Sequence, residues 1–133
     1  MADLVFFYGT LMTGFDRRRR IGIDARMKFR ARGWVRAALF DLGIYPAAVP
    51  AENDRVWGEV FELLEPEAVL SALDEIEGYR PGEPDSSLYI RSIVPVYLPG
   101  GGNEQAWVYF YNAPLGRAPR IDSGDYLEYL KVR

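Results

Sequence analysis

The segment from Glu65 to Arg80 constrains the fold most, because it carries the pattern of an amphipathic helix with both ends marked. Pro66 suits the first turn of a helix, and Gly78 suits the position just after the last turn. At about 100° per residue, the apolar side chains between them fall on one stripe, which comprises Val69, Leu70, Leu73 and Ile76. We therefore predict one helix that packs this stripe against the rest of the chain.

Glu77 follows Leu73 by four residues and projects onto the same apolar stripe. Asp74 lies at the margin of the stripe, and Glu75 lies nearly opposite. A carboxylate on the inner face is partly desolvated and close to the C-terminus of the helix, and both effects raise its pKa. Glu77 could then accept and return a proton near neutral pH. The pattern alone is equally consistent with a glutamate in solvent at a frayed last turn.

Five segments outside this helix have the composition of strands. They run from Leu4 to Tyr8, Gly33 to Leu42, Arg55 to Leu64, Leu88 to Leu98 and Gln105 to Tyr111. The glycine-rich connection over residues 99–104 predicts a β-hairpin between the last two, and Gly43 to Pro46 predicts a turn after the second. Gly58 predicts a bulge or a close contact inside the third. The tail over residues 121–130 fits a short closing helix.

Hairpins, rather than strictly alternating βαβ units, indicate the α+β class. With 133 residues, the chain has the size of one domain with an adequate core, and we assign residues 1–133 to one domain. Short strands with many aromatic residues favour a small, curved, barrel-like sheet with a pocket at one end. An open sheet is the alternative.

Cysteine and histidine are both absent from the sequence. Their absence excludes disulfides, thiol nucleophiles, Ser-His-Asp triads and imidazole metal sites. A carboxylate site for magnesium or calcium is still allowed, but no Asp-x-Asp-x-Asp loop supports one. If the protein is an enzyme, its proton carriers are Asp, Glu, Tyr or Lys.

The charge pattern gives no reason to expect nucleic acid or a membrane as partner. The formal net charge is -3, and the one strong basic run, Arg17 to Arg20, is short and has no interleaved aromatic residues. We interpret that run as a solvated loop or helix face, with a polyanion-binding surface as the less favoured alternative. The N-terminus lacks the pattern of a signal peptide, so we expect a cytoplasmic location.

The first strand runs directly into Tyr8-Gly9-Thr10-Leu11. A glycine at a strand end lets another group approach the backbone closely, and the amides that follow can be left unpaired. Free amides at this position can bind a carboxylate or carbonyl oxygen. For this motif taken alone, an ordinary strand-end turn is the favoured interpretation.

Six short motifs, taken together and in order, resemble the γ-glutamylcyclotransferase-like family, also called AIG2-like. They are Tyr8-Gly9-Thr10-Leu11, Gly43-Ile44-Tyr45-Pro46-Ala47, Val56-Trp57-Gly58-Glu59-Val60, Leu73-Asp74-Glu75-Ile76-Glu77-Gly78-Tyr79, Tyr89-Ile90-Arg91 and Trp107-Val108-Tyr109. Their joint order covers nearly the whole chain. The resemblance implies a mixed β-barrel of about five to seven strands flanked by two or three helices, with no cofactor. It also implies a cavity between the Tyr8 to Leu11 amides and a glutamate, which here is Glu77.

The reaction that the resemblance implies is intramolecular. The α-amine of a γ-glutamyl group attacks its own γ-carbonyl, which closes 5-oxoproline and releases an amine. Glu77 would be the general acid and base, and Tyr8 and the amides of residues 9–11 would line the side of the cavity that holds the small-molecule substrate. We also expect Tyr89 and Tyr109 to contribute hydroxyls to the pocket. No covalent intermediate is required, in agreement with the missing Cys and His.

Three points remain open in the sequence. A non-catalytic module that binds a small molecule in the same pocket is the alternative function. The leaving amine and the oligomeric state are not predicted, although the acidic, hydroxyl-rich loop from Gly82 to Ser87 follows the carboxylate. We expect that loop to border the mouth of the pocket and to favour an amine-bearing leaving group over an anionic one.

Overall fold

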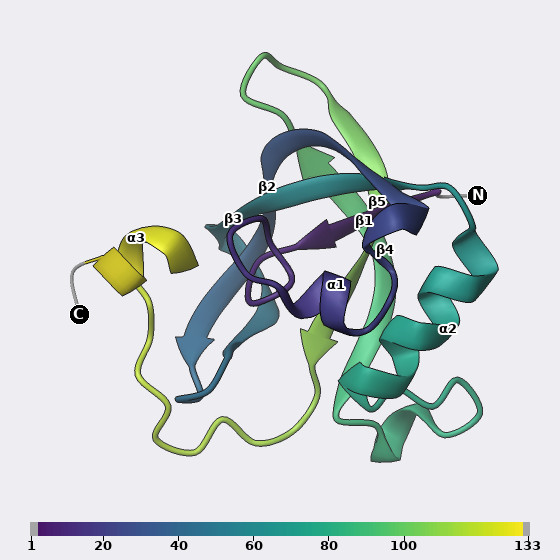
Figure 1. The fold of residues 1–133 in the computed structure, drawn as a ribbon. Helices are drawn as coiled ribbons and strands as arrows, with labels where there is room; N and C mark the ends of the chain where they lie inside the picture. The colour runs from purple at the N-terminus through teal and green to yellow at the C-terminus, as the bar shows by residue number, and fades with distance from the viewer. Residues whose placement is uncertain (1–2, 132–133) are drawn as a thin grey trace.

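The computed structural model describes residues 3–131, in which five strands close into a mixed β-barrel (Figure 1). The strands are β1 (Leu4–Phe7), β2 (Met27–Asp41), β3 (Pro46–Leu63), β4 (Tyr89–Tyr97) and β5 (Asn103–Tyr111). Their order around the barrel is β1-β3-β2-β4-β5, and a parallel pairing of β1 with β5 closes it, while the other pairings are antiparallel. The predicted α+β class with a small mixed barrel is confirmed.

β2 and β3 are longer than the predicted strands. β3 begins at Pro46, the last residue of the predicted turn. The amide of Leu42 donates to the carbonyl of Tyr45 across this turn at 3.1 Å. The β2–β3 register shifts between Phe29 and Ala31 and again between Arg36 and Ala37. Such bulges bend a strand and increase its twist, so the two long strands curve around the barrel instead of forming a flat ribbon.

Gly58 sits on β3 where β1 crosses closest to it. A Cβ atom built on Gly58 would lie 2.1 Å from the carbonyl oxygen of Phe7, which no real side chain tolerates. The predicted close contact at Gly58 is confirmed. The end of β1, where the pocket begins, is therefore placed by direct backbone contact with β3.

Three helices flank the barrel: α1 (Arg17–Arg20), α2 (Pro66–Glu77) and α3 (Tyr126–Lys131). Two 3₁₀ turns, η1 (Asp24–Arg26) and η2 (Pro84–Ser86), lie in the connections. The closing helix is shorter than predicted: the amide of Ile121 donates to the carbonyl of Leu39 at 2.8 Å, so this part of the tail follows β2 instead of coiling. In Figure 1, α2 and α3 lie on opposite sides of the barrel.

α2 has the predicted ends and the predicted buried face. Val69 and Leu73 are fully buried, and Gly78 ends the helix in the left-handed region with φ 67°. Only glycine adopts this conformation at little cost, and the Gly78 amide bonds back to the carbonyl of Glu75. Glu77 is therefore held as the last residue of a well-terminated helix.

Asp74 ties α2 to the barrel. Its carboxylate accepts two hydrogen bonds from Arg91 on β4, at 2.8 and 3.0 Å, and one from the hydroxyl of Tyr109 on β5, at 2.5 Å. The guanidinium of Arg91 also stacks 4.2 Å from the ring centre of Trp107. The helix that carries Glu77 is thereby fixed to two strands one turn away from that residue.

We expect Asp74→Asn to lower the free energy of unfolding by about 2 kcal/mol, because the substitution leaves Arg91 charged and without its bidentate partner. The side chains of Asp74 and Arg91 are 14% and 15% exposed, so water can compensate only in part. Urea denaturation measures the change. Glu75→Gln, at an exposed site on the same helix, is the matched control and should stay within about 0.5 kcal/mol. Equal stability of the two variants would show that the Asp74 network does not hold the helix.

Within residues 3–131, no helix is both long enough and apolar enough to cross a membrane.

Candidate active site

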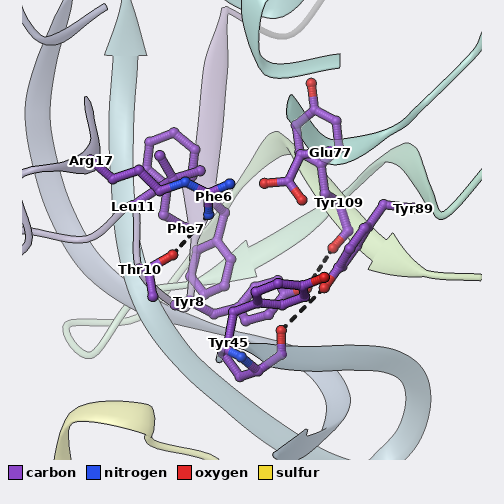
Figure 2. Close-up of a pocket in the computed structure, with 12 residues that line it drawn as sticks. Phe6, Phe7, Tyr8, Thr10, Leu11, Arg17, Tyr45, Glu77, Tyr89 and Tyr109 are labelled. Atoms are coloured by element: carbon purple, nitrogen blue, oxygen red, sulfur yellow. Dashed lines mark hydrogen bonds between the residues drawn. The ribbon is translucent and has the colours of Figure 1, made fainter. Parts of the chain in front are cut away.

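A pocket opens where β1 ends, between the turn that follows β1, the β2–β3 turn and the C-terminal end of α2 (Figure 2). It encloses about 400 Å³, its open mouth included. Its walls are formed by Phe6, Phe7, Tyr8, Gly9, Thr10, Leu11, Arg17, Tyr45, Pro46, Glu77, Tyr89 and Tyr109. The catalytic candidate Glu77 and all six residues expected to bind the substrate, Tyr8, Gly9, Thr10, Leu11, Tyr89 and Tyr109, lie on this one pocket.

The turn after β1 lines the pocket and carries backbone amides with few partners. The amide of Met12 bonds to the carbonyl of Gly9 at 3.1 Å, and the amide of Thr13 donates to the buried carboxylate of Glu59 at 2.7 Å. Among residues 3–131, no group accepts a hydrogen bond from the amides of Gly9, Thr10 or Leu11. Unpaired amides in a turn that lines a pocket can bind a carboxylate or a carbonyl oxygen.

Gly9 is needed because Pro46 packs against its backbone. A Cβ atom on Gly9 would lie 2.8 Å from Cγ of Pro46, closer than real Cβ contacts allow. The absence of a side chain lets the amide-bearing turn rest directly on the start of β3. The contact fixes the position of the free amides.

Glu77 faces this turn from the other side of the pocket (Figure 2). Its side chain is partly buried, and burial raises its pKa from the ordinary 4.5 to about 7, while the nearby guanidinium of Arg17 offsets part of the rise. Glu77 and residues 9–11 line the same pocket, and burial moves the pKa of Glu77 in the expected direction. A carboxyl group with a pKa near 7 can gain and lose a proton at neutral pH.

Arg17 was missed by the sequence analysis, which placed the whole arginine run in solvent. Its Nη1 donates to Oγ1 of Thr10 at 2.8 Å, and its guanidinium faces the Glu77 carboxylate in Figure 2. Four consecutive residues on one helical turn point in directions about 100° apart, so they cannot all avoid the body on which the helix lies. That geometry was the available signal that part of the run turns inward, and Arg18 does so as well, with a side chain that lies over the ring of Phe61.

Three tyrosines close the inner end of the pocket. The Tyr8 hydroxyl donates to the carbonyl of Tyr109 at 2.7 Å and accepts from the amide of Ala48 at 3.3 Å, and the Tyr89 hydroxyl donates to the carbonyl of Pro46 at 3.4 Å. Burial is the main reason why the pKa values of all three phenols are raised, so they stay neutral at physiological pH. Tyr109 contributes its ring rather than the pocket hydroxyl we expected, because its hydroxyl donates to Asp74.

The expectation that the loop from Gly82 to Ser87 borders the pocket was wrong, since none of its residues lines the pocket. The loop leaves the helix at Gly78 and returns to it at Leu88, whose amide donates to the Gly78 carbonyl at 3.0 Å. Within the loop, the Ser87 hydroxyl accepts from the amide of Arg80 and donates to the carbonyl of Glu83. The side chain of Asn112 donates to the carbonyl of Ser87. The loop is therefore held by its own hydrogen bonds and by Asn112, and it is not part of the pocket lining.

Acidic side chains do not gather around the pocket in the part of the chain that the structure describes. Residues 3–131 contain no cluster of three or more Asp or Glu side chains that could hold a metal ion. Glu77 is the one acidic residue in the lining of the pocket.

The chain matches the family model described as gamma-glutamyl cyclotransferase, AIG2-like, over residues 5–128. A protein of Methanocaldococcus jannaschii that is provisionally named a gamma-glutamylcyclotransferase is 30% identical over 128 residues, which cover 96% of this chain and 98% of that protein. The gamma-glutamylcyclotransferase family protein YtfP of Escherichia coli is 38% identical over 90 residues, or 68% of this chain and 67% of YtfP.

Solved structures of this family have the same fold. The solution structure of E. coli YtfP superimposes with a TM-score of 0.66 at 26% identity, covering 95% of this chain and 97% of that one. The crystal structure of an AIG2-like protein from mouse superimposes with a TM-score of 0.69 at 25% identity, covering 92% of this chain and 88% of that one.

Proposed function

Because the chain belongs to the AIG2-like gamma-glutamyl cyclotransferase family, we propose that it converts a γ-glutamyl amide to 5-oxoproline and releases an amine. One observation carries the proposal. The pocket brings a carboxyl group with a pKa of about 7, Glu77, opposite the unpaired amides of residues 9–11. A proton carrier opposite a set of oxygen-binding donors is what an intramolecular acyl transfer requires.

In the proposed reaction, the amides of residues 9–11 bind an oxygen of the γ-glutamyl group and hold its chain in a folded pose. Glu77 takes a proton from the α-ammonium, and the freed amine attacks the γ-carbonyl carbon to form the ring C–N bond. The bond from that carbon to the leaving nitrogen then breaks. Glu77 delivers the protons lost by the attacking nitrogen to the leaving nitrogen, so the reaction consumes no net proton.

The folded pose accounts for part of the rate. Attack within one molecule avoids the entropic cost of bringing two reactants together, provided that the reacting atoms are held near contact distance. The rigid walls around the amides serve this purpose, since Gly9 rests on Pro46 and the Glu59 carboxylate holds the amide of Thr13.

The direct test is incubation of the purified protein with a panel of γ-glutamyl compounds, scored by mass spectrometry for 5-oxoproline. Release of 5-oxoproline from any of them supports the proposal. Binding of these compounds without turnover would instead indicate a non-catalytic module with the same pocket.

We expect Gly9→Ala to lower kcat/KM by about tenfold. The new methyl group must move Pro46 or the amide turn by a few tenths of an ångström, and a displacement of 1 Å costs up to about a hundredfold. Gly82→Ala is the matched control, because a methyl group on Gly82 would meet no heavy atom within 4 Å. Full activity of Gly9→Ala would mean that the position of this turn does not limit the reaction.

A further inference from the structure

Helix α1 needs contacts with the barrel to keep its orientation. It consists of four arginines, none of which belongs to the buried core, and no side chain among residues 3–131 caps its N-terminus. A single helical turn is not stable alone, because its first hydrogen bond does not offset the entropy lost in ordering its residues. The direction in which Arg17 points must therefore be set by what the turn packs against.

The segments on either side of α1 place the turn on the barrel. Phe15 stacks on Tyr126 of α3, with ring centres 6.3 Å apart, and Ile23 is fully buried in the core. Both residues lie outside the helix, so neither contact uses a side chain of α1 itself. Contacts of the arginines are needed to seat the turn in one orientation.

The side chain of Arg18 makes such a contact with β3. It is only 11% exposed, its guanidinium carbon lies 4.3 Å from the ring centre of Phe61, and its Nε lies 3.2 Å from a carboxylate oxygen of Asp24. A cation over an aromatic face is attracted by the ring, and more strongly where water is excluded. The side chains of Arg19 and Arg20, by contrast, are 78% and 71% exposed.

The ring of Phe61 is a firm support for this guanidinium. Phe61 is buried and packs against Phe7, a residue of the pocket wall, with ring centres 5.6 Å apart. The Nε and Nη1 atoms of Arg18 have no hydrogen-bond acceptor among residues 3–131. The ring and the nearby charge of Asp24 therefore hold the guanidinium in place, without a hydrogen-bond network.

We propose that Arg18 is a positioning residue, which keeps the guanidinium of Arg17 beside the carboxylate of Glu77. Successive side chains of a helix point about 100° apart, so seating Arg18 on Phe61 sets the direction in which Arg17 leaves the turn. That direction brings Nη1 of Arg17 to 2.8 Å from the Thr10 hydroxyl and leaves the guanidinium facing Glu77 (Figure 2). The inference rests on the proposed function, in which Glu77 carries the protons.

The pH at which Glu77 titrates reports the position of Arg17. The guanidinium of Arg17 lowers the pKa of Glu77, in opposition to the larger effect of burial. Among residues 3–131, Arg17 is the one cationic side chain in the lining of the pocket. The other titratable side chains that line it with Glu77 are the phenols of Tyr8, Tyr45, Tyr89 and Tyr109. A displaced Arg17 should therefore move the titration of Glu77 to higher pH.

The test follows the carboxyl carbon of Glu77 by NMR during a pH titration, which requires no turnover. Arg18→Gln should move the titration to higher pH, in the same direction as Arg17→Gln. In the Arg17→Gln background, the change at Arg18 should have no further effect, because the guanidinium that Arg18 positions is gone. If the effect of Arg18→Gln were equal in both backgrounds, the charge of Arg18 would act directly and the inference would be overturned.

Arg19→Gln is the matched control. It removes the same charge from the next position of α1, where the side chain is 78% exposed, and it should keep the wild-type titration of Glu77. Arg18→Lys is the second variant and decides the inference if Arg18→Gln does not fold. It keeps the charge but not the planar guanidinium on the ring, so it should displace the titration in the same direction by a smaller amount. A wild-type titration in the folded Arg18 variants would reject the positioning role.

Activity gives a second readout. At pH 6, Arg18→Gln should lower kcat/KM for 5-oxoproline release by about threefold, as expected for the loss of one partly solvated charge pair. At pH 9 the difference should largely disappear, because Glu77 is ionised in both proteins. If no γ-glutamyl compound is turned over, the proposed function fails, and the titration of Glu77 alone decides whether Arg18 positions Arg17.

Discussion

Glu77→Gln is expected to lower kcat on any accepted γ-glutamyl substrate by at least about 10²-fold, since general acid and base catalysis contributes roughly 10²- to 10⁴-fold. Glutamine matches glutamate in shape and can keep the hydrogen bonds that hold a ligand, but it cannot carry a proton. The loss should therefore fall on kcat with little change in the affinity for the substrate. Steady-state kinetics together with calorimetric binding separate the two quantities.

Glu75→Gln is the control for this experiment, because Glu75 lies on the exposed face of the same helix and should change activity little. Circular dichroism checks that each variant is folded. Above pH 7, Glu77→Gln should be at least as stable as the wild type, because it removes a partly buried negative charge. If Glu77→Gln kept near-normal turnover while Glu75→Gln lost it, the proton carrier would have been assigned to the wrong residue.

The second large effect is the dependence of kcat/KM on pH. The proposed base is the ionised form of Glu77, whose pKa is raised to about 7. Below pH 7 the protonated form accumulates, so kcat/KM should fall about tenfold per pH unit and be about a hundredfold lower at pH 5 than at pH 8. An acid limb near pH 4.5 would indicate that Glu77 is not buried as described or is not the base.

Arg17 provides an internal check on this profile. Its guanidinium lowers the pKa of Glu77, in opposition to the larger effect of burial. Replacing Arg17 by Gln removes that favourable charge, so the acid limb should move to higher pH. If the acid limb of Arg17→Gln stayed at the wild-type pH, Arg17 would not influence the pKa of Glu77.

The raised pKa of Glu77 also makes the stability of the fold depend on pH. A folded-state pKa of about 7 exceeds the ordinary value of 4.5, so the native state holds the Glu77 proton more tightly than the unfolded chain does. The stabilisation from this proton is fully present below about pH 4.5 and is lost as the pH rises to about 7. The proposed activity therefore falls in the pH range in which Glu77 opposes folding.

Local features of the sequence were sufficient to predict α2 and the position of Glu77. Pro66, Gly78 and the spacing of the apolar side chains are all contained within one helix, and their consequences need no knowledge of distant residues. The glycine at the end of the first strand indicated a turn with free amides only as the less favoured alternative to an ordinary strand-end turn. The family resemblance then placed the two features in one cavity, which periodicity alone could not do.

Features that depend on distant contacts were predicted poorly. Residues 46–54 were not recognised as part of β3, because Pro46, Pro50 and a polar run break the alternating pattern and the segment is held by its pairing with β2. The inward turn of Arg17 depends on Thr10 and on the location of Glu77. The path of residues 82–87 depends on Asn112, which lies far along the sequence.

The closure of the barrel has a consequence for how the protein reaches its active form. β1 is the first strand of the chain, yet it pairs in parallel with β5 near the other end, with Val5 opposite Trp107. Contacts between residues on the order of a hundred positions apart form late and slowly, because the chain must first give up the freedom of the intervening loop. During synthesis, β1 and the amides that follow it emerge long before the strand that completes their sheet. Helix α2 can form earlier, but Glu77 faces those amides in a closed barrel only after β5 has been made. A nascent chain therefore contains every proposed catalytic group before it has a working site.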